Sequence, residues 1–408
     1  MKKAAVWTDK VLEFLFFGLI ILTPISTALS NILIGLLFII FLLKIIFFRD
    51  INYKTDLNKY ILMFFLLSIL SIIKAADINY SIKSLVNPLL KISVFYFIAY
   101  DLINYDKLKK VYKALIISGV LAFSYGAYID YFTTDNFYNH NNSNGTFAAV
   151  MTIFFLTYIL YKENNIYKRI LFTILSLGGF ALVTSYSRGA SLAFAIGIFI
   201  WFIMYFIKYK NIKFITIILI IFILLSVFVV PEELYDRFKK IENIEDNSSL
   251  KTRVVMWHAS LLMIRDNPLL GVGIGNFNSN FNYYIDNVME ANIVPGDRSQ
   301  YHPHNIYLYI ASEQGIPSLV ILLVLLIKLF IIGYKNYQKN HDWNLITAMG
   351  LIMIAVNTIV AVHSMVDTTF RHNKVSFYVI VFTVINLKIY NQHWMETDSQ
   401  KEKGVLDA

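Results

Sequence analysis

Residues 301–308 read YHPHNIYL and carry two histidines, His302 and His304, on either side of a proline. Pro303 suits the first turn of a helix, where its missing N–H costs nothing. That helix should end near Gln314, because Gly315 is a typical C-terminal stop. In the first turn the helix dipole disfavours imidazolium, so His304 is a candidate proton acceptor for a hydroxyl group. The alternative is that both histidines only cap an interface. Pro303 between them predicts that the two rings point in different directions.

Arginines and one aspartate supply further candidates for a site. Arg188 lies in TSYSRGASL at the start of an apolar segment, and an arginine near membrane depth is costly and usually paired. Snorkelling to the outer interface is the alternative, but the small and polar neighbours favour a pocket. Arg253 and Arg265 lie on a predicted helix, where a solvated charge is the simpler explanation for each. Asp367, in VHSMVDTTFRHNK, either supports a site or pairs with Arg371.

Two other kinds of site are not favoured. The glycines of GVGIGNF (271–277) lack the spacing and the strand–helix context of a dinucleotide fingerprint, so a tight turn is predicted. The sequence has no Asp-x-Asp pair or carboxylate cluster suited to Mg²⁺, and the two histidines lack further zinc ligands. We expect no metal and no cofactor, so arginines would have to balance the charge of any phosphorylated substrate.

The composition indicates which kind of secondary structure must position these residues. The chain has 408 residues, of which 57% are hydrophobic, and no cysteine. Apolar runs recur along most of its length, and a helix needs about 20 such residues to cross a bilayer. The net charge of +9 comes largely from short connections between apolar runs, so it does not indicate nucleic-acid binding. The sequence predicts an all-α polytopic membrane protein.

We predict about twelve transmembrane helices, with Pro24 kinking the first. Lysines and arginines concentrate in alternate short connections, which places both termini in the cytoplasm. The connection 76–83 is an exception, because it carries Lys83. The predicted spans are 11–28, 30–48, 59–75, 84–103, 112–132, 146–161, 168–184, 190–207, 212–230, 316–334, 343–363 and 375–391.

The spans divide the chain into four parts. Residues 1–230 hold nine transmembrane helices, 231–303 form a large loop on the outer face, 304–391 hold the last three helices, and 392–408 form a cytoplasmic tail. Long connections are usually functional or disordered. Within this loop, SLKTRVVMWHASLLMIRDNP (249–268) shows helical spacing, with a stop at Asn267-Pro268. We therefore expect a small folded cap of helices on the outer surface.

RVVMWHASLLMIRDNPLLGVGIGNF followed by HPHNIYLYIASEQGIPSL resembles the shared core of bacterial O-antigen ligases and O-antigen polymerases. The SRGA element at 187–190 and the opening TPISTALSNILIGLLFII fit the same family. The resemblance implies about twelve spans, a large periplasmic loop and cytoplasmic termini, in a membrane-embedded, GT-C-like glycosyltransferase of the bacterial inner membrane. It also implies a metal-independent, inverting reaction at the periplasmic face.

The resemblance further implies the substrates and the site. The donor would be a glycan on undecaprenyl diphosphate, and the acceptor of a ligase would be a sugar hydroxyl of lipid A–core. The family's essential histidine corresponds to His304, and its two arginines correspond to Arg188 and Arg253. For Arg253 the resemblance therefore favours a role in the site over a solvated charge. His302, Asn305, Arg265 and Asp367 are further candidates for substrate binding.

Three other functions stay open. Polymerases and protein O-oligosaccharyltransferases share this core, although the length and N-terminal stretch favour a ligase. A transporter of the same lipid would need polar groups along a path at the bilayer midplane. Lys328 and Asn357 are the nearest to such groups and do not form a track. The candidate residues instead gather at the outer face, which favours an enzyme.

Overall fold

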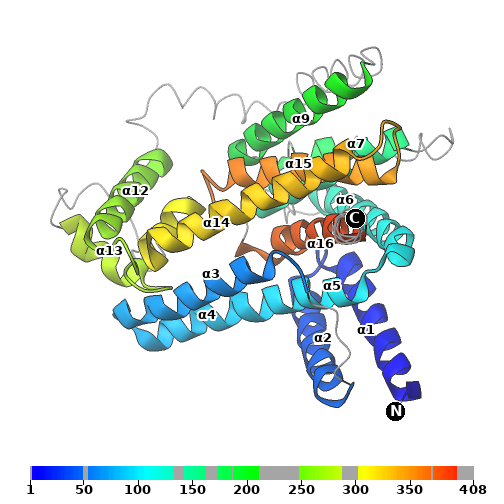
Figure 1. Ribbon diagram of the computed structural model, residues 1–408. Helices are drawn as coiled ribbons and strands as arrows, with labels where there is room; N and C mark the ends of the chain where they lie inside the picture. Colours follow the sequence, from blue (N-terminus) through cyan, green and yellow to red (C-terminus); the bar gives the residue numbers. More distant parts are fainter. Residues whose placement is uncertain are drawn as a thin grey trace, which may run out of the picture.

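The computed structural model describes most of the chain as helices (Figure 1). The described residues are 2–48, 54–132, 142–161, 173, 175, 177–182, 184, 185, 187–210, 248–286, 302–368 and 371–392. Within these ranges there is no β-strand. The prediction of an all-α protein is therefore confirmed. The predicted spans 168–184 and 212–230 lie partly and wholly outside the described residues.

In the first half of the chain, the described residues form eight α-helices and three short 3-10 or π segments. Pro24 does not kink a span as predicted, because the first helix ends at Leu22 and the next begins at Thr27. The elements are α1 (Lys2–Leu22), α2 (Thr27–Phe48), α3 (Asn58–Ser71), η1 (Ile72–Lys74), α4 (Ile78–Ile92), η2 (Ser93–Ile98), α5 (Ala99–Leu102), η3 (Tyr105–Lys107), α6 (Leu108–Phe132), α7 (Asn142–Tyr161) and α9 (Arg188–Tyr209).

The second half adds a helical cap and three long helices. The predicted loop contains α12 and α13, and α12 ends directly before Asn267-Pro268, as expected from the stop signal. Val255, Met256, Phe277 and Phe281 of these helices pack with Ile306 and Tyr309 in one hydrophobic cluster. The elements are α12 (Ser248–Asp266), α13 (Phe277–Asp286), α14 (Ile306–Gln338), α15 (Leu345–His363) and α16 (Asn373–Tyr390).

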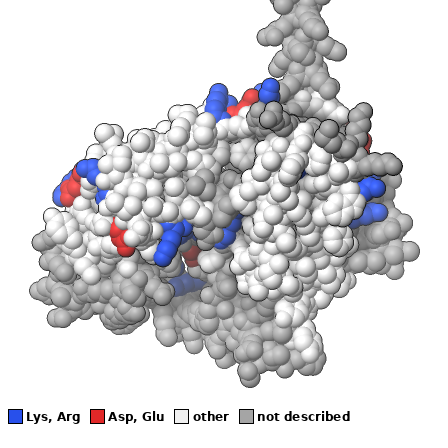
Figure 2. Space-filling view, turned by 90° about the horizontal axis from the view of Figure 1, so that it is seen from below, with Lys and Arg blue, Asp and Glu red and all other residues white. Residues whose placement is uncertain are grey.

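Six helices are long and apolar enough to cross a membrane, among the residues that the structure describes. The predicted count of twelve is not confirmed. Figure 2 shows a face that is largely uncharged, with its charged residues confined to a few places, as suits a protein bordered by lipid. The six segments are Thr27–Phe48, Tyr105–Tyr128, Asn142–Tyr161, Arg188–Tyr209, Ile306–Gln338 and Leu345–His363.

Helix α15 lies at the centre of the bundle and contacts α7, α9, α14 and α16 (Figure 1). Small residues allow its close approach to α14. A Cβ atom on Gly350 would lie 2.6 Å from the carbonyl oxygen of Gly333 and 2.4 Å from the backbone nitrogen of Tyr337. Such small residues are typical of helix contacts within membranes. The packed pair α14–α15 thereby fixes the segments at its ends, which carry the candidate site.

Candidate active site

His304 lies just before α14 and not in its first turn. Asn305 is the N-cap, and its Oδ1 accepts hydrogen bonds from the backbone N–H groups of Tyr307 and Leu308. The prediction that Pro303 starts the helix was wrong, because asparagine is the stronger N-cap and sits two residues later. The predicted interruption at Gly315 is present, since its φ of 82° and ψ of 167° break the helical geometry of α14.

The backbone of His304 adopts a left-handed conformation with φ of 46°. This conformation is uncommon for a residue other than glycine and turns the chain sharply between Pro303 and α14. As a result the ring centroids of His302 and His304 lie 4.1 Å apart. The prediction that the two rings point in different directions was therefore wrong. Trp257 of α12 donates a hydrogen bond to the carbonyl oxygen of Pro303 at 2.7 Å, which holds this turn against the cap.

Asp367 faces His304 from the segment after α15. Its Oδ1 lies 3.9 Å from Nδ1 of His304, a distance for ion pairing that is longer than a hydrogen bond. The amide of Asn142, the first residue of α7, donates to Oδ2 of Asp367. Burial raises the pKa of the Asp367 carboxyl, but His304, the N–H of Thr368 and nearby His363 together lower it to about 2. Asp367 is therefore an ionised, almost fully buried carboxylate.

Arg253 of α12 reaches the same segment. Its Nη1 donates to the carbonyl oxygen of Val366 at 2.9 Å. Burial and the charge of Arg188 lower the pKa of Arg253, whereas Asp367 opposes that change. The two guanidinium groups thus lie close enough to repel each other, with one carboxylate near Arg253. Such a pair favours binding of an anion, because a guanidinium binds phosphate oxygens through two parallel hydrogen bonds.

Arg188 is the first residue of α9, and its neighbours fasten that helix end to the site. Ser187 is the N-cap and accepts a hydrogen bond from the N–H of Ala190. The hydroxyl of Ser187 also donates to Oδ1 of Asn142 at 2.7 Å. Asn142 therefore connects the start of α9 with Asp367, and the SRGA element lies beside the His304–Asp367 pair. The sequence left open whether Asp367 pairs with Arg371. In the structure Arg371 instead lies over the ring of Tyr309, 4.7 Å from its centroid.

Two buried residues near the site were missed by sequence reasoning. His363 is 1% exposed, and its Nδ1 lies 2.6 Å from Oγ1 of Thr146. A Cβ atom on Gly189 would lie 2.9 Å from Nε2 of His363, so glycine beside Arg188 permits this close packing. The sequence signal was the spacing of His363 and Asp367, because residues four apart lie on the same face of a helix. In the structure, the N–H of Asp367 donates to the carbonyl oxygen of His363 at 3.0 Å.

Glu313 is the second missed residue, and it fastens the cap to α14. The three glycines of GVGIG all have positive φ, which confirms the predicted tight turn. Oε2 of Glu313 accepts a hydrogen bond from the N–H of Gly275 at 2.7 Å, and Oε1 accepts one from the N–H of Phe277 at 3.0 Å. Glu313 is 1% exposed, so this buried carboxylate anchors the turn that joins α12 to α13.

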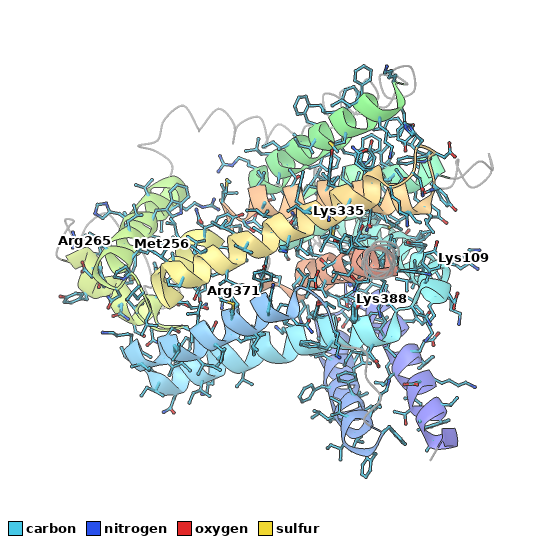
Figure 3. All side chains as sticks on the ribbon, viewed as in Figure 1. Lys109, Met256, Arg265, Lys335, Arg371 and Lys388 are labelled. Carbon is cyan, nitrogen blue, oxygen red and sulfur yellow. The ribbon has the colours of Figure 1, made fainter. Side chains whose placement is uncertain are left out.

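Arg265 does not join the other candidates. It forms an exposed ion pair with the adjacent Asp266 at 2.9 Å, and Figure 3 shows it at the far end of the cap. Twelve residues of helix separate it from Arg253, which corresponds to about 18 Å along the axis. The substrate-binding role predicted for Arg265 has no support from this position. Among the described residues no group of three or more His, Cys, Asp or Glu side chains could hold a metal ion.

Residues 173–323 match the family model described as O-antigen ligase. No curated protein matches the chain. The fold is that of a multi-pass helical membrane protein, and the matched region includes Arg188, Arg253, His302 and His304. The resemblance found in the sequence is thereby confirmed for residues 173–323, the segment that matches the O-antigen ligase and polymerase family. Members of this family are glycosyltransferase-like enzymes that act on lipid-linked glycans.

Proposed function

We propose that this protein is an O-antigen ligase, which transfers a glycan from undecaprenyl diphosphate to a sugar hydroxyl of lipid A–core. One observation carries the proposal. An imidazole, a buried carboxylate and two mutually repelling guanidinium groups occur together, although they come from α9, α12 and the segments before α14 and after α15. This set provides a base for the acceptor and positive charge for a diphosphate leaving group.

His304 is the general base in this proposal. If Nδ1 carries a proton toward Asp367, the second ring nitrogen, Nε2, is left with a free lone pair. Nε2 then removes the proton of the acceptor hydroxyl as its oxygen attacks the anomeric carbon of the donor sugar. Among the described residues, Nδ1 of His304 has no hydrogen-bond partner. Catalytic hydrogen bonds often tighten only when substrate is bound, and a shift of about 1 Å would complete the contact with Asp367.

Arg188 and Arg253 act on the leaving group. As the new glycosidic bond forms, the bond between the anomeric carbon and the diphosphate oxygen breaks, and its electron pair stays with the diphosphate. The two guanidinium groups stabilise that growing charge. Attack from the face opposite the leaving group inverts the anomeric centre. Arginines that are always charged can do this without a metal ion.

The proposed location is the bacterial inner membrane, with the site open to the periplasm. The support is the distribution of lysine and arginine in the short connections, which assigns the termini to the cytoplasm and the 231–303 loop to the opposite side. A reporter fused after residue 395 should behave as cytoplasmic, and one inserted near Asn287 as periplasmic. A periplasmic C-terminus would contradict this orientation and would move the site to the other face.

The acceptor is tested by loss of the gene. Cells without a ligase should accumulate long glycan chains that stay on the lipid carrier and do not reach lipid A–core. Cells without a polymerase should instead show single repeat units attached to lipid A–core, and that result would overturn the ligase proposal. Modified proteins that lose their glycan, with lipopolysaccharide intact, would identify a protein O-oligosaccharyltransferase.

A further inference from the structure

A cavity of about 470 Å³ lies between α3, α4 and α14, apart from the His304–Asp367 cluster. Its volume is within the range of about 300–1,000 Å³ that is usual for sites of small ligands. The walls are mainly apolar and aromatic. On the other side of α3, Leu62, Met63 and Leu66 are exposed, so one wall of the cavity is a helix whose outer face suits lipid. Apolar lining residues include Ile61, Phe64, Leu85, Phe95, Ile310 and Leu322.

Three basic side chains also line this cavity, namely Lys83, Lys91 and Arg371, and none of the described residues that line it is acidic. Figure 3 shows Arg371 between α14 and the α3–α4 pair. Lys91 and Arg371 lie close enough to repel each other. The negative charge of Glu313 acts on Arg371. Both carboxylate oxygens of Glu313, however, already accept hydrogen bonds from backbone N–H groups. Positive charge beside an apolar cavity favours a ligand that has an anionic group and a long apolar part.

The basic end of the cavity adjoins the proposed active site. Ile306 lines the cavity and follows His304 by two residues, and Arg371 follows Asp367 by four. His372 interacts electrostatically with charged residues of both regions. Burial lowers the pKa of His372, the charges of Arg371 and Lys91 lower it further, and Asp367 opposes them. The charge state of His372 therefore depends on Asp367 of the cluster and on Lys91 and Arg371 of the cavity.

We propose that this cavity binds the polyprenyl chain of the lipid-linked donor, with Lys91 and Arg371 facing the phosphate that carries the chain. The inference rests on the proposed function. In the donor, only two phosphates separate the reacting carbon from the lipid chain, so the chain must start beside the catalytic cluster. In lipid A–core, sugars separate the reacting hydroxyl from the lipid. A lipid cavity that adjoins His304 and Asp367 therefore fits the donor.

Binding of undecaprenyl phosphate to the purified full-length protein, measured by native mass spectrometry in detergent, tests the proposal. This probe has the chain and a phosphate but no sugar, so binding is measured without turnover. Leu322→Trp should fill the cavity and weaken binding at least tenfold. Leu323→Trp is the matched control, because Leu323 is 41% exposed and does not line the cavity. Lys91→Ala should weaken binding several-fold, whereas Lys74→Ala, at an exposed position outside the cavity, should not.

Four results test this proposal and distinguish its failure from failure of the proposed function. His304→Ala should abolish transfer and still bind undecaprenyl phosphate with unchanged affinity. If binding follows the cavity variants but no ligase activity exists, the lipid site stands and the proposed function falls. If Leu322→Trp binds the probe and transfers glycan like the unmodified protein, the cavity proposal is overturned. Equal displacement of the probe by phosphatidylglycerol would also overturn it, since the cavity would then be a general lipid site.

Discussion

The carboxylate of Asp367 and the imidazole of His304 face each other at 3.9 Å between Oδ1 and Nδ1. Asp367 comes from the segment after α15 and His304 from the turn before α14, and the backbone connects these two segments directly. The N–H of Ile306 donates to the carbonyl oxygen of Ser364 at 2.9 Å. The pair is therefore held by the scaffold itself, and only a small shift of side chains is needed to form a hydrogen bond.

His304→Ala should abolish detectable glycan transfer, because a positioned general base contributes about 10²–10⁴-fold in rate. The measurement is conversion of purified lipid-linked glycan and lipid A–core to the joined product. His302→Ala should retain measurable transfer, since the contact with Asp367 is made by His304. Thermal unfolding in detergent should show both variants folded. Full activity of His304→Ala would eliminate this histidine as the base.

Asp367→Asn should lower transfer by weakening the orientation of His304, and its effect on stability should depend on pH in a defined way. The pKa of Asp367 is lowered to about 2, against about 3.9 for an unfolded chain. A lowered pKa stabilises the fold at pH values above the unfolded pKa, by about 2–3 kcal/mol here, and this contribution is lost as pH falls toward 2. The difference in melting temperature between the two proteins should shrink as pH falls below 4. A difference that stays unchanged down to pH 2 would contradict an ionised Asp367.

The sequence was sufficient for part of this site because some residues act through local chemistry. Gly271, Gly273 and Gly275 predicted their turn, since positive φ suits glycine. Pro303 misled the assignment of the helix start, because Asn305 competes for the cap and only the folded chain shows which residue prevails. The left-handed backbone of His304 then follows from contacts that sequence spacing does not encode. For the same reason, the prediction that the rings of His302 and His304 point in different directions was wrong.

Contacts between distant segments explain the other differences. Asn142 precedes Asp367 by 225 residues, yet the two side chains are hydrogen-bonded. Glu313 looked like one polar residue in an apolar helix, and its partners Gly275 and Phe277 belong to the cap. Arg253 and Arg265 looked alike on the same predicted helix, but only Arg253 faces α15 and the segment that follows it. Hydropathy identifies apolar helices and cannot specify which faces meet.

Glu313→Gln should destabilise the cap. An amide offers one acceptor oxygen where the carboxylate offers two, so either Gly275 or Phe277 keeps a buried N–H without a partner. Such a group costs about 1–3 kcal/mol, and the melting temperature should fall accordingly. Glu13→Gln is the control, because Glu13 forms partly exposed ion pairs with Lys107 and Lys110, and such pairs contribute about 0–1 kcal/mol. Equal melting temperatures for the two variants would show that Glu313 does not anchor the turn.

Transfer should continue in the presence of EDTA, because the proposed reaction uses the charges of Arg188 and Arg253 at the leaving group. The measurement compares rates for protein treated with EDTA and for protein supplied with Mg²⁺ or Mn²⁺. The chelated protein should retain its rate within the error of the assay. Loss of transfer on chelation, followed by recovery with either ion, would rule out arginines as the sole counter-charge.

Arg188→Lys and Arg253→Lys should each reduce transfer by about 10²-fold, the usual effect of removing one group that stabilises charge in the transition state. Lysine keeps the charge but cannot form two parallel hydrogen bonds to phosphate oxygens. At position 253 it would also lose the guanidinium geometry that reaches the carbonyl of Val366. Arg265→Lys is the matched control on the same helix, because Arg265 pairs only with exposed Asp266 among its ion-pair contacts in the described chain. The rate with Arg265→Lys should equal that of the unmodified protein. If Arg188→Lys and Arg253→Lys also kept full rates, simple positive charge would suffice, and a bidentate hold on the diphosphate would be excluded.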